Sequence, residues 1–103
     1  MSDGFIAVAE AAAIPIGASK QVIVSGKEIA VFNIDGQFYA TADECTHDEA
    51  FLSEGETFGY VVECPLHGAR FDVRTGKALS LPAVYPVKTY EVQVIDGQIR
   101  LRM

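Results

Sequence analysis

Short runs of hydrophobic and polar residues fill most of the chain, and turn-forming residues separate them. Several runs alternate apolar and polar positions, as a strand with one buried face requires. β-Branched and aromatic residues are frequent in these runs. The pattern predicts strands at 21–24, 28–34, 37–42, 60–63, 87–95 and 98–102. We therefore expect an all-β chain.

Two Asp-Gly pairs connect neighbouring strands, at 35–36 and 96–97. An Asp-Gly pair between apolar runs favours a two-residue type I′ hairpin, because both of its residues tolerate a positive φ. A third turn is expected at 74–77, closing a hairpin that begins at 70–73. Residues 7–13 suggest the single helix, which Pro15 would end early.

The chain length of 103 residues predicts one compact domain, 1–103, since no linker, repeat or low-complexity segment divides it. Half of the residues are hydrophobic, which also fits one compact domain. The pattern of short strands then predicts a small β-sandwich or barrel. A core of this size is thin, so a bound metal is one way to supplement it.

The charge balance narrows the classes of partner. Eight Lys and Arg against fourteen Asp and Glu give a net charge of −6, which disfavours nucleic acid and anionic membranes as partners. The longest apolar stretches, 5–9 and 11–16, are far shorter than the roughly 20 residues of a membrane span. The N-terminus lacks the basic region of a secretory signal, so we expect a cytoplasmic protein.

The segment 43–63 is strongly acidic and contains no Lys or Arg. It holds seven acidic residues: Asp43, Glu44, Asp48, Glu49, Glu54, Glu56 and Glu63. Such a segment is either an ordinary solvated face or a docking surface for a basic partner.

All Cys and His residues of the chain occur in two compact pairs, Cys45-Thr46-His47 and Cys64-Pro65-Leu66-His67, separated by sixteen residues. All four side chains are potential ligands of a soft or borderline metal. Each pair follows a predicted strand, so two loops facing each other across one four-ligand site are expected. The alternative is two buried thiols and two surface imidazoles, which would make the matched pairs accidental.

The order of the ligands bears on the identity of the metal. Zinc fingers usually place like ligands together, two Cys and then two His, whereas each loop here mixes one Cys with one His. A pair of irons explains the mixture, because in Rieske centres two His replace two Cys on one of the two irons. Zinc remains the alternative.

The two pairs and their spacing resemble the Rieske [2Fe-2S] signature, Cys-x-His followed after sixteen residues by Cys-x-x-His. Residues 64–72 and 74–78 resemble the soluble ferredoxins of bacterial aromatic-ring-hydroxylating oxygenase systems, and the resemblance covers nearly the whole chain. It implies a Rieske-like fold, in which antiparallel sheets form a small sandwich with a cluster-binding subdomain at about 43–86.

The resemblance also implies a cofactor and its ligands. One [2Fe-2S] cluster per chain is expected, with Cys45 and Cys64 as thiolate ligands of the inner iron. His47 and His67 would be the imidazole ligands of the outer iron, near the surface. Residues 81–86 look like the proline-containing loop that covers the cluster, although an ordinary turn is also compatible with them.

Four positions depart from the high-potential members of the family. Ala50 and Leu66 stand where respiratory Rieske proteins carry the two Cys of a disulfide. Ala69 and Phe71 stand where those proteins place a Ser and a Tyr hydroxyl against the cluster and ligand sulfurs. Hydroxyl donors favour the extra negative charge of the reduced cluster, so their absence predicts a low reduction potential.

The resemblance and the ligand count together predict an electron carrier rather than an enzyme. Both His are assigned to the cluster, which leaves none for the two-His-one-carboxylate iron site of an oxygenase. No glycine-rich nucleotide fingerprint marks the chain as the reductase. We expect a monomer that moves single electrons from a reductase to a terminal oxygenase in aromatic hydrocarbon catabolism. The alternatives are a Rieske-like small subunit of a nitrite reductase and a zinc-stabilised interaction module.

Overall fold

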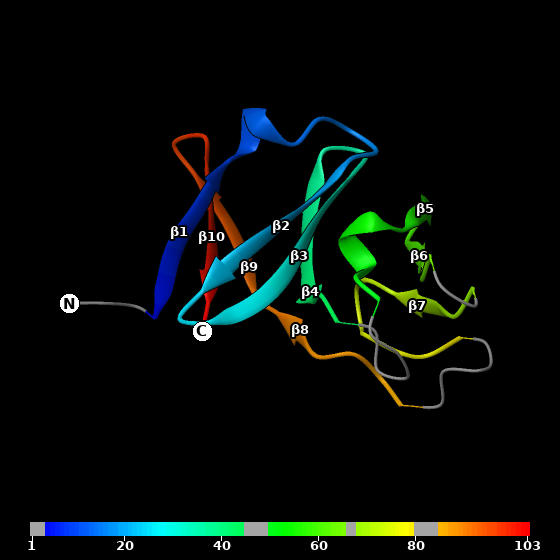
Figure 1. Cartoon of the computed structure of the whole chain (residues 1–103). Helices are drawn as coiled ribbons and strands as arrows, with labels where there is room; N and C mark the ends of the chain where they lie inside the picture. Colours follow the sequence, from blue (N-terminus) through cyan, green and yellow to red (C-terminus); the bar gives the residue numbers. More distant parts are fainter. Residues whose placement is uncertain (1–3, 45–49, 66–67, 80–84) are drawn as a thin grey trace.

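The computed structural model describes residues 4–44, 50–65, 68–79 and 85–103. Within these ranges the chain is almost entirely β-structure (Figure 1). The strands are β1 (Phe5–Glu10), β2 (Ser19–Val24), β3 (Lys27–Ile34), β4 (Gln37–Ala42), β5 (Glu56–Phe58), β6 (Val61–Glu63), β7 (Arg70–Asp72), β8 (Thr89–Tyr90), β9 (Val92–Ile95) and β10 (Gln98–Arg102). Two short 3₁₀ helices, η1 (Ala11–Ala13) and η2 (Leu52–Glu54), complete the described elements. The all-β prediction is confirmed, and no described helix is long and apolar enough to cross a membrane.

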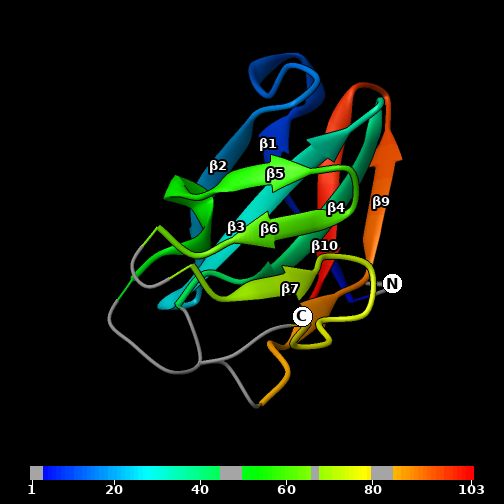
Figure 2. The same ribbon diagram turned by 90° about the vertical axis from the view of Figure 1, so that its right-hand side faces the viewer.

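The described strands form three antiparallel sheets. The first sheet has the order β1-β10-β9, the central sheet β2-β3-β4-β8 and the small sheet β5-β6-β7. The central sheet lies between the other two, with the small sheet in front of it in the view of Figure 2. The small sheet and the described residues next to both predicted ligand loops, Ala50, Cys64 and Ala69, pack in one buried cluster on the same side of the central sheet.

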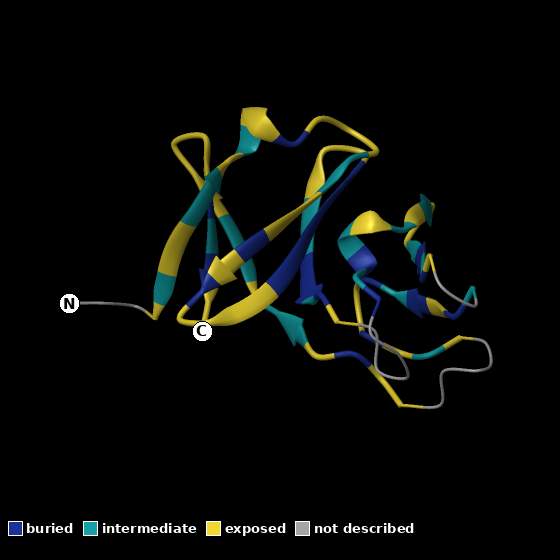
Figure 3. Cartoon of the chain, in the orientation of Figure 1, coloured by how far each residue is buried: buried dark blue, intermediate teal, exposed yellow. Residues whose placement is uncertain are grey.

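Strand β3 is buried on both faces because it lies in the middle layer (Figure 3). Ile29 and Val31 belong to the apolar core shared with the first sheet, where they join Ile99 and Leu101 of β10. The alternate residues of β3 point to the opposite side and form a second core with the small sheet. That second core contains Ala30, Phe32, Ile34, Ala50, Leu52, Val62, Cys64, Ala69, Phe71, Val73 and Val87. The apolar run in β3 is thus explained by two cores rather than one.

The three predicted turns are present. Asp35 and Gly36 have φ values of 53° and 90°, and Asp96 and Gly97 have φ values of 52° and 76°, as a type I′ turn requires. The turn at 74–77 closes the third hairpin, with the N–H of Gly76 donating to the carbonyl of Asp72 at 2.7 Å.

Two predictions from the sequence are wrong in detail. The expected helix at 7–13 is absent, because residues 7–10 lie in β1 and pair with β10, and only Ala11–Ala13 turn into a 3₁₀ helix. The expected strand at 87–95 is two strands, β8 in the central sheet and β9 in the first sheet. In both cases pairing with a distant strand overrides the local pattern.

Candidate metal centre

Of the four predicted ligands, Cys64 lies in the described part of the chain. Cys45, His47 and His67 lie outside the described residues. Cys64 follows β6 directly, and its residue surface is 1% exposed. The geometry of the site is therefore defined by Cys64 and by the segments that begin and end each ligand loop.

The second ligand loop is closed by the small sheet. Strands β6 and β7 pair in register, with Glu63 opposite Arg70. One step further, the backbone N–H of Cys64 donates to the carbonyl of Ala69 at 2.7 Å. Gly68 has a φ of 72°, a conformation that glycine adopts without strain. The Cys64–Ala69 segment is thus a hairpin loop with Cys64 at its base.

The first ligand loop is also closed by backbone contacts between its two ends. Glu44 pairs with Phe51 in an isolated antiparallel bridge, and the N–H of Leu52 donates to the carbonyl of Asp43 at 2.7 Å. This loop begins after β4 and ends just before η2. Its two ends are therefore held side by side, as are those of the second loop.

Both loops leave from one apolar base. Ala50 and Leu52 at the end of the first loop belong to the same buried cluster as Cys64 and Ala69 of the second. The burial of Cys64 in this cluster suits a metal-bound thiolate, because the metal compensates the charge and the apolar residues keep water away. A set of two Cys and two His donors on loops with a common base fits a [2Fe-2S] cluster of the Rieske type.

A third segment approaches the same region from the C-terminal side. The N–H of Val87 donates to the carbonyl of Gly76, and the carbonyl of Lys88 accepts from the N–H of Ala42, both at 2.8 Å. Val87 is buried in the same core as Cys64 and Ala69. Residues 81–84 of the expected covering loop lie outside the described residues, but the strand-like stretch that follows them is tied both to β4 and to the 74–77 turn.

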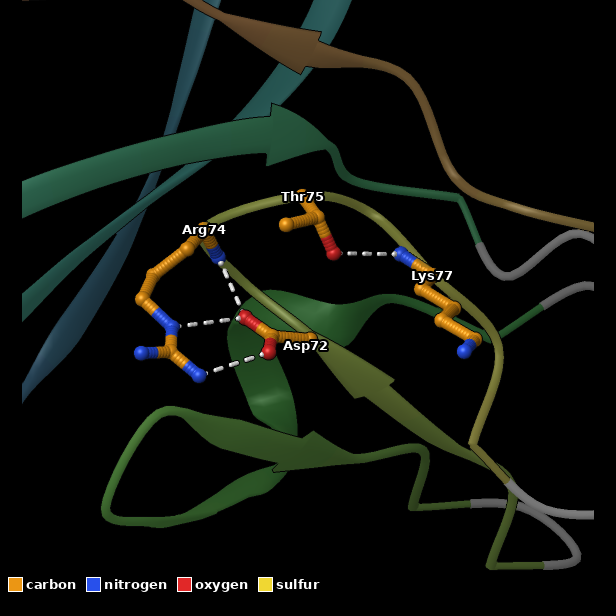
Figure 4. A network of polar contacts seen from close by, with 4 residues as sticks. All are labelled: Asp72, Arg74, Thr75 and Lys77. Atoms are coloured by element: carbon orange, nitrogen blue, oxygen red, sulfur yellow. Dashed lines mark hydrogen bonds and ion pairs between the residues drawn. The ribbon is translucent and has the colours of Figure 1, made fainter.

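The 74–77 turn is itself stiffened by polar contacts (Figure 4). The Arg74 guanidinium donates two hydrogen bonds to the Asp72 carboxylate, from Nε at 3.1 Å and from Nη2 at 2.9 Å. The N–H of Arg74 also donates to Asp72 Oδ1, and that of Lys77 to Thr75 Oγ1. The side-chain hydrogen bonds from Arg74 lower the pKa of Asp72 below its ordinary value. The turn therefore presents Gly76 to Val87 in one conformation.

The acidic segment is less uniform than the sequence suggested. Glu44, Glu54 and Glu56 are exposed, and Glu63 forms an ion pair with Arg70 at 3.1 Å. Asp43, in contrast, is fully buried. Counting Asp43 as part of a surface was wrong, because its side chain faces inward to Ser53 and Gln21. No signal in the sequence separates this Asp from its acidic neighbours.

A hollow of about 320 Å³ lies beside Cys64. The residues that line it include Glu54, Glu56 and Glu63. The described surface next to Cys64 is therefore acidic, as the composition of segment 43–63 predicted.

The fold and the site together define a class: a small all-β domain with two Cys-His loops on one base, the arrangement of a Rieske iron–sulfur protein. The family model of the Rieske [2Fe-2S] domain matches residues 4–91. The chain belongs to this family, and its cofactor is a [2Fe-2S] cluster.

Relatives narrow the class further. The chain is 47% identical over 90 residues to the ferredoxin component of the naphthalene 1,2-dioxygenase/salicylate 5-hydroxylase systems of a Ralstonia species, covering 87% of this chain and 86% of the relative. It is 47% identical over 100 residues to the 3-phenylpropionate/cinnamic acid dioxygenase ferredoxin subunit of Photorhabdus laumondii, covering 96% and 92%. Such relatives are electron-transfer components rather than catalysts, and this chain is a ferredoxin of the same kind.

A solved structure agrees with this assignment. One chain of the complex of reduced oxygenase and oxidized ferredoxin in carbazole 1,9a-dioxygenase superposes with a TM-score of 0.90 at 38% identity. The match covers 98% of this chain and 94% of that one. The predicted Rieske-like fold is confirmed.

The contact between Gly76 and Val87 generates a testable prediction. A Cβ on Gly76 would overlap the carbonyl oxygen of Val87, whereas a Cβ on Gly26 meets nothing within 4 Å. The two glycines have nearly the same φ, 79° and 78°, so Ala carries the same backbone strain at both. We expect Gly26→Ala to lower the free energy of unfolding by about 1 kcal/mol and Gly76→Ala by about 2–4 kcal/mol.

Urea unfolding followed by circular dichroism measures both variants. Equal midpoints for the two would mean that the 74–77 turn does not hold the segment at Val87.

Proposed function

We propose that this chain carries single electrons from a reductase to the terminal oxygenase of an aromatic-ring-hydroxylating system. The observation that carries the proposal is the 47% identity to ferredoxin components over nearly the full length of both proteins. The solved neighbour that is seen in complex with an oxygenase supports the same kind of partner here. The nitrite reductase and zinc-module alternatives are not favoured by these relatives.

We propose Cys45, Cys64, His47 and His67 as the cluster ligands. The two thiolates would bind one iron and the two imidazoles the other, so that each loop contributes to both. When bound, the cluster accepts and releases one electron. The protein holds the Cys64 sulfur in an apolar cluster that also contains Ala69 and excludes water.

The segment 43–86 is proposed as the cluster-binding subdomain of the single domain 1–103. The small sheet and the ends of both ligand loops fall within this segment, which supports the assignment. We also propose a cytoplasmic monomer. A reducing compartment keeps Cys45 and Cys64 available as thiolates rather than as a disulfide.

Docking is proposed to rely on the exposed carboxylates near the second ligand loop. Glu54 and Glu56 stand on the wall of the hollow beside Cys64. Transient redox complexes use small interfaces and gain association rate from complementary charge. We therefore expect basic patches on the reductase and on the oxygenase.

The first prediction of this proposal concerns the ligands. His47→Ala and His67→Ala should each abolish the Rieske-type absorption and EPR spectra and lower the yield of folded protein, because metal binding and folding are coupled in a small domain. Cys45→Ala and Cys64→Ala should be at least as damaging, since each removes an anionic ligand. Iron and acid-labile sulfide analysis measures the loss; a red His67→Ala protein with the wild-type spectrum would contradict the ligand set.

The second prediction concerns docking. The second-order rate of electron transfer should fall as salt rises above physiological concentration, because screening weakens attraction between exposed charges. A Glu54→Gln, Glu56→Gln double variant should lower that rate about twofold to fivefold at low salt. Glu10→Gln with Glu91→Gln, in which two exposed carboxylates outside segment 43–63 are neutralised, is the matched control and should leave it unchanged. Stopped-flow reduction by the reductase decides; equal rates for both double variants would favour an ordinary solvated face.

The third prediction concerns the reduction potential. Ala69 and Phe71 are fully buried in the core that contains Cys64, and neither carries a hydroxyl. Ala69→Ser and Phe71→Tyr should each raise the potential by placing a donor near a sulfur that becomes more negative on reduction. A charge-assisted hydrogen bond is worth about 1.5–3 kcal/mol. A tenfold change in a one-electron equilibrium constant corresponds to about 59 mV, so one such bond should raise the reduction potential by some tens of millivolts to about a hundred.

Voltammetry on the two single variants and the double variant measures these shifts. Potentials that stay constant or fall while the cluster spectrum is intact would assign the control of the potential to solvent exposure or to the acidic surface instead.

A further inference from the structure

Asp43 is the one acidic residue of the described chain that is fully buried. It follows β4 directly and precedes Cys45 by two positions. A carboxylate without solvent is costly unless hydrogen bonds replace the lost water. Buried hydrogen-bond donors are therefore expected around the Asp43 carboxylate.

The carboxylate accepts three hydrogen bonds. Oδ1 accepts from the backbone N–H of Ser53 at 2.7 Å. Oδ2 accepts from Ser53 Oγ at 2.8 Å and from Gln21 Nε2 at 2.7 Å. These donors are neutral, so among the described residues the carboxylate is held by directional hydrogen bonds and not by an opposite charge.

The backbone of Asp43 is held as well. Its N–H donates to the carbonyl of Glu28 at 3.0 Å, and its carbonyl accepts from the N–H of Leu52 at 2.7 Å. One residue thus connects β2, β3 and η2. Ser19 extends the network, because its Oγ donates to the carbonyl of Ser53 at 2.7 Å.

Asp43 and Ser53 flank the first ligand loop along the chain. Asp43 precedes the segment that carries Cys45 and His47, and Ser53 follows it. The bonds between Asp43 and Ser53 therefore tie the two ends of the loop together, next to the Glu44–Phe51 bridge. We refer to Asp43, Ser53 and Gln21 as the carboxylate clamp.

The second loop has no need of such a clamp. Its two ends are neighbouring strands of one sheet, and the strand pairing continues to the bond between Cys64 and Ala69. The first loop instead runs from a strand to η2, which belongs to no sheet. There the side-chain bonds of Asp43 add to the single Glu44–Phe51 bridge and to the backbone bond from Leu52.

We propose that Asp43 is a positioning residue for the cluster: through the carboxylate clamp it fixes the two ends of the loop that contains Cys45 and His47. This inference depends on the ligand set proposed above. A hydrogen-bonded carboxylate has few alternative arrangements in a buried site, so it fixes the positions of Asp43 and Ser53 more narrowly than apolar packing does.

The test compares three variants of the holoprotein. Asp43→Ala removes all three side-chain bonds of the carboxylate. Asp43→Asn keeps the shape: its amide oxygen accepts from the Ser53 N–H, and its NH₂ donates to Ser53 Oγ and to a rotated Gln21 amide. Asn33→Ala is the matched control, since Asn33 is also buried and hydrogen-bonded, but to Ile14 and Gly36, outside the ligand loops.

Three readouts separate positioning from plain stability: the EPR g-values of the reduced cluster, its reduction potential and the rate of cluster loss below the unfolding midpoint. Asp43→Ala should shift the g-values and the potential and should speed cluster loss about tenfold or more. Asn33→Ala should lower the unfolding midpoint but leave g-values and potential unchanged. Asp43→Asn should keep the wild-type g-values that Asp43→Ala loses.

Unchanged g-values and potential in Asp43→Ala would overturn the proposal. If Asp43→Ala does not fold, Ser53→Ala replaces it, because it removes one bond and should shift the g-values in a smaller but measurable way; wild-type values there would also overturn it. Absence of a Rieske-type signal from the wild-type protein would instead refute the proposed ligands, so the two failures are distinguishable.

Discussion

The burial of β3 on both faces is the constraint on which the rest of the structure depends. Its alternate side chains supply one core toward the first sheet and a second core toward the small sheet. A chain of 103 residues has little interior, and using one strand in both cores allows three layers to form from it. Strands β2 and β4 add further apolar residues, but β3 is the strand of the central sheet that places several fully buried side chains in each core.

The second core is also the base of the metal centre. Phe32 of β3, Val62 of β6 and Phe71 of β7 lie in the same cluster as Cys64 and Ala69. The same buried residues therefore pack the small sheet and anchor the ends of the ligand loops. This arrangement explains why a bound cluster and the folded state are expected to stabilise each other.

Different kinds of bond hold the segments around the site. The second ligand loop uses a strand ladder, and the segment at Val87 uses backbone bonds to Gly76 and to β4. The first ligand loop combines one backbone bridge with the bonds of a buried carboxylate. Backbone bonds tolerate many side chains, whereas the carboxylate clamp requires Asp43 and its donors. The first loop is consequently the one whose geometry depends most on particular side chains.

The sequence by itself determined the all-β class, the two Asp-Gly hairpins and the pairing of Cys with His, because each is a local pattern with a local physical cause. Only the tertiary structure decided that residues 7–10 form a strand, since their pairing with β10 outweighs a weak helical pattern. It also divided 87–95 between two sheets, and it buried Asp43 while leaving Glu44 exposed. Adjacent acids look alike in a sequence. The difference arises because Asp43 has hydrogen-bond donors 22 residues before it, at Gln21, and 10 residues after it, at Ser53, which no local pattern brings together.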